Sequence, residues 1–399
     1  MSGGGARAAY QIGVLKYLAS RYPELVPGIL TGVSAGGIIA TCLAAREGRF
    51  DDAICRLDEL WRGLRIEHVF RVDPGELASR VTRWGFRLAS GGAPGTPRAR
   101  SLLDTTPLRE LLAVTLKPDD EGRLPAITGN VAARRLDAVA LTASSYTTGQ
   151  SVTWVQNAGG CRAVTWEHPQ RTSADGCLTL DHVMASAALP FFFPAVQIEG
   201  SWYGDGGIRL TAPLSPAIHL GARKIIAVST RYPRVREEAR PAVSGYPPPA
   251  QVAGVLLNAI FLDLLDADAL RLQQLNALLD RLPPEAWNGL RHVDLLVLRP
   301  SQDLGRLANE FEAALPRTFR FLVRGLGSRE TRSNDMLSLL MFHPDYIAKV
   351  IELGEADARA RSADIEAFVQ RSDERVRRPT TRERLARFLS VMRNRLAGS

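Results

Sequence analysis

The stretch TGVSAGG, residues 31–37, places a single serine, Ser34, between Gly32 and Gly36. The β-branched apolar residues before it predict a strand, and the apolar residues after it predict a helix. Ser34 therefore falls on a sharp turn that needs small residues two positions before and after it. Such a turn exposes the hydroxyl at a helix N-terminus, where developing negative charge is favoured. The spacing indicates a nucleophile, and the alternative is an N-cap serine.

A run of glycines near the N-terminus, SGGGARAAYQ, precedes a predicted helix. Read as Gly3-x-Gly5-x-x-Ala8, it is half of a dinucleotide fingerprint, which also needs an acidic residue ending a second strand. Glu24 has the right distance but does not follow a strand pattern. Read beside a nucleophile, Gly3, Gly4 and Gly5 offer uncovered N–H groups for an oxyanion hole. We favour the oxyanion hole.

A second glycine-rich turn, WYGDGG, holds Asp205 followed by Gly206 and Gly207. An aspartate in a turn is usually structural, but a serine nucleophile needs a base. Histidine is the usual base, and a Ser–Asp–His order requires one after Asp205. The histidines that qualify by position alone are His219, His292 and His343.

The order of elements predicts an α/β fold, because strand patterns alternate with helical ones. We expect a mostly parallel central sheet between helices on both faces, followed by a mainly helical C-terminal extension. Proline- and glycine-rich stretches over 89–100 and 232–250 are predicted as loops. The predicted strands are 28–33, 136–145, 151–155, 224–230 and 293–299, and the first two predicted helices are 8–19 and 35–45.

Composition is that of an ordinary globular protein, with 45% apolar and 23% charged residues. No apolar run approaches the ~20 residues that span a bilayer, and no signal peptide is evident. The four cysteines show no metal-ligand spacing, so we expect free thiols, no metal, no cofactor and a cytoplasmic location.

The net charge of +8 is concentrated at the C-terminus, where residues 371–399 carry nine arginines against three acidic residues. The nearly neutral remainder argues against a nucleic-acid surface. Thr380 and Glu383 form a capping box, and the basic amphipathic helix it opens would cover 380–397. We favour docking of this helix on its own domain; the alternative is peripheral contact with an anionic membrane.

Together these motifs resemble those of the patatin-like phospholipase family. SGGGARAA resembles its oxyanion loop, GVSAG its nucleophile elbow, and DGG its third motif; the block from Ala185 to Pro194 resembles the segment before that motif. The resemblance covers roughly residues 1–220. It implies a three-layer α/β/α fold and an acyl hydrolase acting on lipid esters.

The resemblance also implies site roles. Ser34 and Asp205 would form a dyad without histidine. The N–H groups of Gly4, Gly5 and Ala6 would bind the oxyanion, and Arg7 would order this loop. Residue Ala8 stands where the family commonly has glycine.

We predict a catalytic domain over 1–220, a strand and linker over 221–250, and an extension over 251–399 with the basic tail 371–399. The family's loop follows a buried first strand, so either that strand lies upstream of residue 1 or the sheet is one strand short. Two alternative functions stay open. One is a Ser–His–Asp esterase using His292 or His343, and the other is an inactive lipid-binding or scaffold protein.

Overall fold

The structure is a computed structural model that describes residues 1–71, 73–91, 101–157, 166–233, 248–261, 264–325 and 333–371. The chain divides into two units, Met1–Ala360 and Arg361–Ser399. The first unit holds the sheets and all the residues discussed below. The described part of the second consists of α16 (Ser362–Gln370) and its flanking residues.

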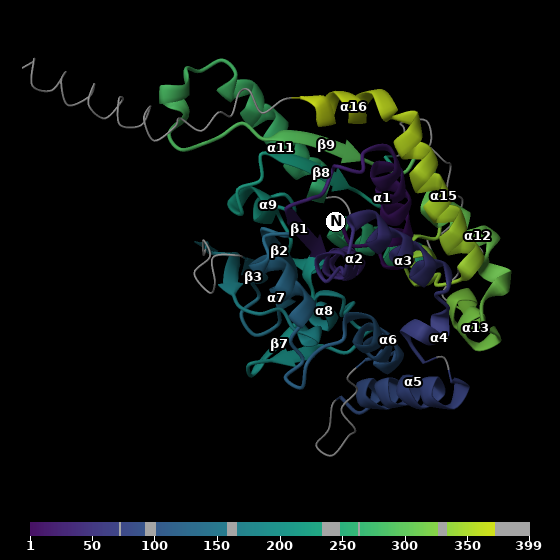
Figure 1. Ribbon diagram of the computed structural model, residues 1–399. Coiled ribbons are helices and arrows are strands. Elements are labelled where there is room, and N and C mark those ends of the chain that lie inside the picture. The colour runs from purple at the N-terminus through teal and green to yellow at the C-terminus, as the bar shows by residue number, and fades with distance from the viewer. Residues whose placement is uncertain are drawn as a thin grey trace, which may run out of the picture. The chain divides into compact units, whose positions relative to one another are not determined.

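The strands of the first unit form two sheets (Figure 1). The larger has the order β4-β5-β3-β2-β7-β6, with β1 paired to β2, and the smaller pairs β8 with β9. The larger sheet is made of β1 (Ile29–Val33), β2 (Ala138–Ser145), β3 (Ser151–Asn157), β4 (Glu167–His168), β5 (Arg171–Asp175), β6 (Val196–Ile198) and β7 (Ser201–Asp205), and the smaller of β8 (Lys224–Val228) and β9 (Asp294–Leu298).

Helices precede and follow these strands along the chain. Up to β8 they are η1 (Gly5–Ala8), α1 (Ala9–Arg21), α2 (Ala35–Ala44), α3 (Phe50–Arg62), α4 (Ile66–Val69), α5 (Pro74–Ala89), α6 (Thr106–Leu116), α7 (Pro125–Ala132), α8 (Leu180–Ser186), η2 (Gly206–Ile208) and α9 (Ser215–His219). After β8 come α10 (Pro249–Phe261), α11 (Leu264–Leu279), η3 (Pro284–Trp287), α12 (Leu304–Glu310), η4 (Glu312–Ala314), α13 (Arg317–Gly325), α14 (Asp335–Leu340) and α15 (Pro344–Ala360).

The prediction of a mostly parallel sheet is wrong, because the larger sheet is mixed. β1 runs parallel to β2, and β3 runs parallel to β5. The other pairs of this sheet are antiparallel. Tight reversals account for three of these antiparallel pairs: residues 146–150 join β2 to β3, residues 169–170 join β4 to β5, and Glu199–Gly200 join β6 to β7. Connections this short permit only antiparallel neighbours.

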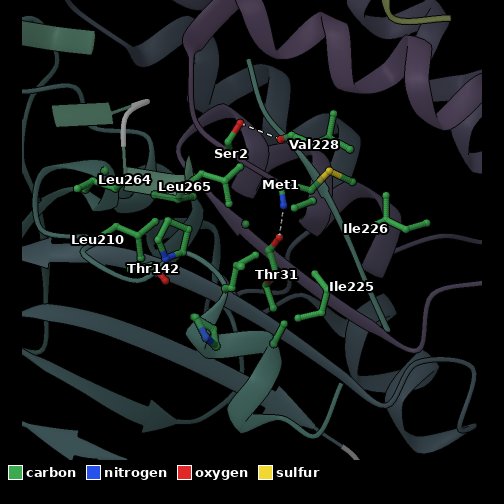
Figure 2. A pocket seen from close by; sticks show the side chains of 18 residues that line it. Met1, Ser2, Thr31, Thr142, Leu210, Ile225, Ile226, Val228, Leu264 and Leu265 are labelled. Atoms are coloured by element: carbon green, nitrogen blue, oxygen red, sulfur yellow. Dashed lines mark hydrogen bonds between the residues drawn. The ribbon is translucent and has the colours of Figure 1, made fainter. Parts of the chain in front are cut away.

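The first two residues lie between β1 and β8 (Figure 2). The Met1 ammonium donates to the Thr31 carbonyl at 2.9 Å, and the Ser2 hydroxyl donates to the Val228 carbonyl at 3.0 Å. The apolar pocket around them is lined by both strands and by Leu264 and Leu265. Met1 and Ser2 thus connect the two sheets just before the glycine run.

The helix that follows the glycine run is held by a close helix crossing. Figure 1 shows α1 beside α15. A Cβ on Gly13 of α1 would lie 1.9 Å from the Ile351 carbonyl, and one on Gly354 of α15 would lie 2.2 Å from the Tyr10 carbonyl. Glycine at both positions lets the two backbones touch, which fixes α1 and the loop preceding it.

Three sequence predictions fall on residues outside this description. They are the loop over 89–100 beyond residue 91, the linker over 232–250 between residues 234 and 247, and the basic helix over 380–397. Among the described helices, none is long and apolar enough to cross a membrane.

Gly354→Ala should lower the free energy of unfolding by about 2–3 kcal/mol, because the added methyl meets backbone that cannot move aside. Gly129→Ala on α7 is the matched control, since a Cβ there meets nothing within 4 Å. The control should gain about 0.5–1 kcal/mol from the better helix propensity of alanine. Urea unfolding of the three proteins measures both effects, and equal behaviour of the two variants would contradict the close crossing.

Candidate active site

Ser34 lies on the turn from β1 to α2 with a strained backbone, φ 55° and ψ −133°. Positive φ is unusual for a residue with a Cβ and is typical of functional sites. A Cβ on Gly32 would lie 2.4 Å from the Gly36 carbonyl, and one on Gly36 would lie 2.2 Å from the Ser2 carbonyl. Both glycines are therefore required by close backbone approach, which is the mechanical reason for the Gly-x-Ser-x-Gly spacing.

The Ser34 hydroxyl does not cap α2, although Ser34 occupies the N-cap position. The backbone is held instead: the Ser34 N–H donates to the Ser186 hydroxyl at 3.0 Å, which donates to the Thr142 carbonyl at 2.7 Å. The side-chain oxygen is thus left for other chemistry. Sequence reasoning quoted Ser186 only as part of a motif block and missed this supporting role.

Asp205 is the last residue of β7 and is fully buried. Its Oδ1 accepts the Gly207 N–H at 2.9 Å, whereas its buried Oδ2 has no hydrogen-bond partner of good geometry among the described residues. A Cβ on Gly206 would lie 2.1 Å from the Thr142 carbonyl, so only glycine lets this turn pack on β2. The DGG motif therefore orients the carboxylate through one of its two oxygens.

Burial raises the pKa of Asp205 to about 7, because the charged form loses its water. The Ser34 side chain and the Gly207 N–H interact with the carboxylate and lower this pKa in part. A carboxylate with a pKa near neutrality is a competent proton acceptor. The site thus joins a strained serine to a carboxylate of raised basicity.

The glycine run lies against this pair. A Cβ on Gly3 would lie 3.0 Å from the Ser34 Cβ. Gly4 and Gly5 have φ values of 139° and 53°, which an L side chain rarely adopts. Neither of their N–H groups donates a hydrogen bond to another described residue. Ala6, Arg7 and Ala8 belong to η1, and α1 begins at Ala9, one residue after the start of the predicted helix over 8–19.

An apolar pocket opens at Ser34. Gly4, Gly5 and Ser34 form its polar end. Its other lining residues are all aliphatic or aromatic. They come from α2, α3, α4, α6, the segment after α8, α14 and the residues next to these elements: Ala35, Ile38, Leu60, Trp61, Leu64, Val69, Leu108, Leu111, Leu112, Ala187, Leu189, Phe193, Leu339, Leu340 and Phe342. A pocket of this composition accommodates a hydrocarbon chain.

The histidines have other surroundings, and none lines this pocket. His182 hydrogen-bonds Thr179 in a capping box, and burial lowers its pKa to about 4. His219 stacks on Trp166 at 4.7 Å. His292 lies between Asp280 and Asp294, while His343 lies 3.8 Å from Asp345. The described residues contain no cluster of acidic, histidine and cysteine side chains that could hold a metal ion.

Comparison with known proteins identifies the family. The family model of patatin-like phospholipases matches residues 1–218 of the 399, so the chain belongs to this family and the predicted resemblance is confirmed. A search of curated proteins found no match. Among solved structures, VipD from Legionella pneumophila matches with a TM-score of 0.32 and 13% identity; the match covers 88% of this chain and 66% of that one.

Asp205→Asn should stabilise the fold at pH 8 by up to about 4 kcal/mol, because it removes a buried charge whose pKa is raised from 3.8 to about 7. The native state binds a proton that the unfolded state releases between these values. The advantage of the variant should therefore shrink as the pH falls from 7 to 4. Urea unfolding across this range measures it.

Exposed Asp120 provides the control, since Asp120→Asn should change stability little at any of these pH values. If Asp205→Asn is instead less stable than the wild type at pH 8, the buried charge of Asp205 does not destabilise the fold.

Proposed function

We propose that this protein is a serine acyl hydrolase that cleaves ester bonds of lipids through Ser34 and Asp205. The observation that carries the proposal is the strained Ser34, whose side chain interacts with the fully buried carboxylate of Asp205. Membership of the patatin-like phospholipase family supports it. The apolar pocket that starts at Ser34 supports an acyl chain as the group being transferred.

In the first half of the reaction, the Ser34 Oγ attacks the ester carbonyl carbon while its proton passes to Asp205. The carbonyl oxygen becomes an oxyanion that the N–H groups of Gly4 and Gly5 stabilise. Collapse of this intermediate breaks the bond to the alcohol, and Asp205 returns the proton to the departing oxygen. The acyl group is left on Ser34.

In the second half, water attacks the acyl-enzyme carbonyl and gives its proton to Asp205. The second oxyanion occupies the same N–H groups. Breakage of the bond to Ser34 releases the fatty acid, and the proton returns to the serine oxygen. The carboxylate ends each cycle ionised, as it began, so the working pH must lie at or above its pKa.

Two alternatives remain to be tested. A Ser–His–Asp esterase needs a histidine, and His343 is the strongest candidate because it follows Phe342 of the pocket and its buried Nδ1 has no hydrogen-bond partner. An inactive lipid-binding protein would keep the pocket and lack an activated serine. Substitution of the serine, the aspartate and the late histidines separates these possibilities.

A fluorophosphonate probe should label the wild-type protein, because labelling needs only an activated serine and an oxyanion site. Ser34→Ala should abolish labelling, and Asp205→Asn should slow it at least 100-fold through loss of the base. His292→Ala and His343→Ala should label like wild type. Loss of labelling in a folded histidine variant would favour the triad, and an unlabelled folded wild type would favour the binding protein.

As the pH increases, kcat/KM for ester hydrolysis should rise about tenfold per pH unit until about pH 7 and then level off, because Asp205 acts in its ionised form. The rising limb of the profile thus ends near the pKa of Asp205. A carboxylate of ordinary pKa would place this limb near 4. The same limb should persist in His343→Ala. A limb near 4 in the wild type would contradict the desolvated base.

A further inference from the structure

The glycine run is followed by a buried cation whose partners lie far along the chain. Arg7 is 3% exposed. Its Nη2 contacts the Asp335 Oδ1 at 2.7 Å and the Asp335 carbonyl at 2.8 Å, and its Nε donates to the Ser338 hydroxyl at 2.6 Å. The remaining Nη1 donates to the Asn258 Oδ1 at 3.3 Å. These partners lie on α14 and α10, beyond the residues that the family model matches.

A guanidinium is always protonated in proteins, so burying it requires a compensating negative charge. Asp335 supplies that charge and is itself 6% exposed. The Asn334 side chain caps α14 by accepting the Leu337 N–H at 3.0 Å, which fixes the start of the helix and with it the place of Asp335. The ion pair is therefore a rigid connection between α14 and the N-terminal loop.

The connection reaches the candidate oxyanion donors through one peptide group. The Arg7 N–H donates to the Gly4 carbonyl at 3.1 Å. That carbonyl and the Gly5 N–H belong to the same planar unit and point in opposite directions. Holding the Gly4 carbonyl toward Arg7 therefore turns the Gly5 N–H away from it. Without side chains of their own, the glycines depend on such outside contacts.

Other contacts leave this loop little freedom. The Thr230 hydroxyl donates to the Gly3 carbonyl at 2.8 Å. A Cβ on Gly5 would lie 2.1 Å from the Leu339 carbonyl, so the last turn of α14 touches the loop backbone. Both contacts come from residues after 218, the last residue of the family match. The loop is thus enclosed by the part of the chain that the family model does not describe.

We propose that Asp335 is a positioning residue, which holds Arg7 and thereby sets the orientation of the Gly5 N–H toward the oxyanion. The inference rests on the proposed hydrolase function for its kinetic consequence. Asp335 touches neither the substrate pocket nor Ser34, so its effect falls on the rate of the chemical step rather than on binding of the acyl chain.

Asp335→Asn tests this role, because it keeps the shape and the Oδ1 acceptor while removing the charge. We expect fluorophosphonate labelling to slow 10- to 100-fold, and kcat for a short-chain ester to fall by a similar factor with KM changed less than twofold. Loss of one oxyanion donor has effects of about 10²–10³ on kcat, which sets the upper bound. Labelling at the wild-type rate would overturn the proposal.

Glu312→Gln is the matched control. Glu312 is 8% exposed and its Oε1 contacts the Arg324 Nε at 2.7 Å, but it lines neither the pocket nor the loop. This variant should label within twofold of wild type. If Asp335→Asn fails to fold, Ser338→Ala takes its place. This substitution removes one hydrogen-bond partner of Arg7, and alanine is well tolerated within a helix. It should slow labelling about threefold to tenfold. Wild-type labelling by folded Ser338→Ala would then overturn the proposal.

Hydrogen exchange separates this inference from the proposed function. In a Ser34→Ala background, Asp335→Asn should speed amide exchange at least tenfold in a peptide covering residues 2–11, and Glu312→Gln should not. This readout needs no activity, so an unlabelled wild type would refute the hydrolase while the loop contact is still tested. Unchanged exchange in Asp335→Asn would refute the positioning role even in an active enzyme.

Discussion

The strained backbone of Ser34 is the constraint on which the rest of the site depends. A residue with a Cβ at positive φ costs about 1–3 kcal/mol and persists only where its surroundings fix it. Here β2 supplies that frame: Thr142 pairs with Val33, the residue before the serine, and the adjacent Ala143 pairs with Asp205. Two neighbouring residues of one central strand thus align the strained serine and the carboxylate, which lie 171 positions apart in the sequence.

One physical cause links the carboxylate to the rest of the proposed mechanism. Burial of Asp205 raises its pKa, and the hydrogen bonds of the Ser34 side chain and the Gly207 N–H offset this only in part. The same dry surroundings strengthen any hydrogen bond from Gly4 or Gly5 to a developing oxyanion. In the proposed mechanism, the apolar pocket lined by α3 and α6 contributes to the second effect, because it excludes water from the carbonyl being attacked. In the proposed hydrolase the pocket would therefore strengthen the oxyanion contacts as well as hold the acyl chain.

The elements that local rules determine could be predicted from the sequence. The turn at Ser34 was predictable because strand, turn and helix follow one another within 16 residues, Ile29–Ala44, and the ordered motifs indicated the family. The mixed sheet was missed although the signal was present: residues 146–150 are too few for the crossover that a parallel pair requires. The contact of Arg7 with Asp335 had no such signal, since 328 positions separate the two residues and no periodic pattern relates them.

The residues after 218 accordingly do more than extend a catalytic domain. Thr230, Asp335 and Leu339 enclose the glycine run, while Leu339, Leu340 and Phe342 form one side of the apolar pocket. A single stretch, α14 and the residues that follow it, therefore touches both the candidate oxyanion donors and the space for the acyl chain. Because packed backbone transmits small displacements, a change in this stretch that alters the shape of the pocket also moves the loop. In the proposed hydrolase, the residues of this stretch that line the pocket therefore couple chain-length preference to catalytic rate, whereas Asp335 on the same helix does not line the pocket and acts on the rate alone.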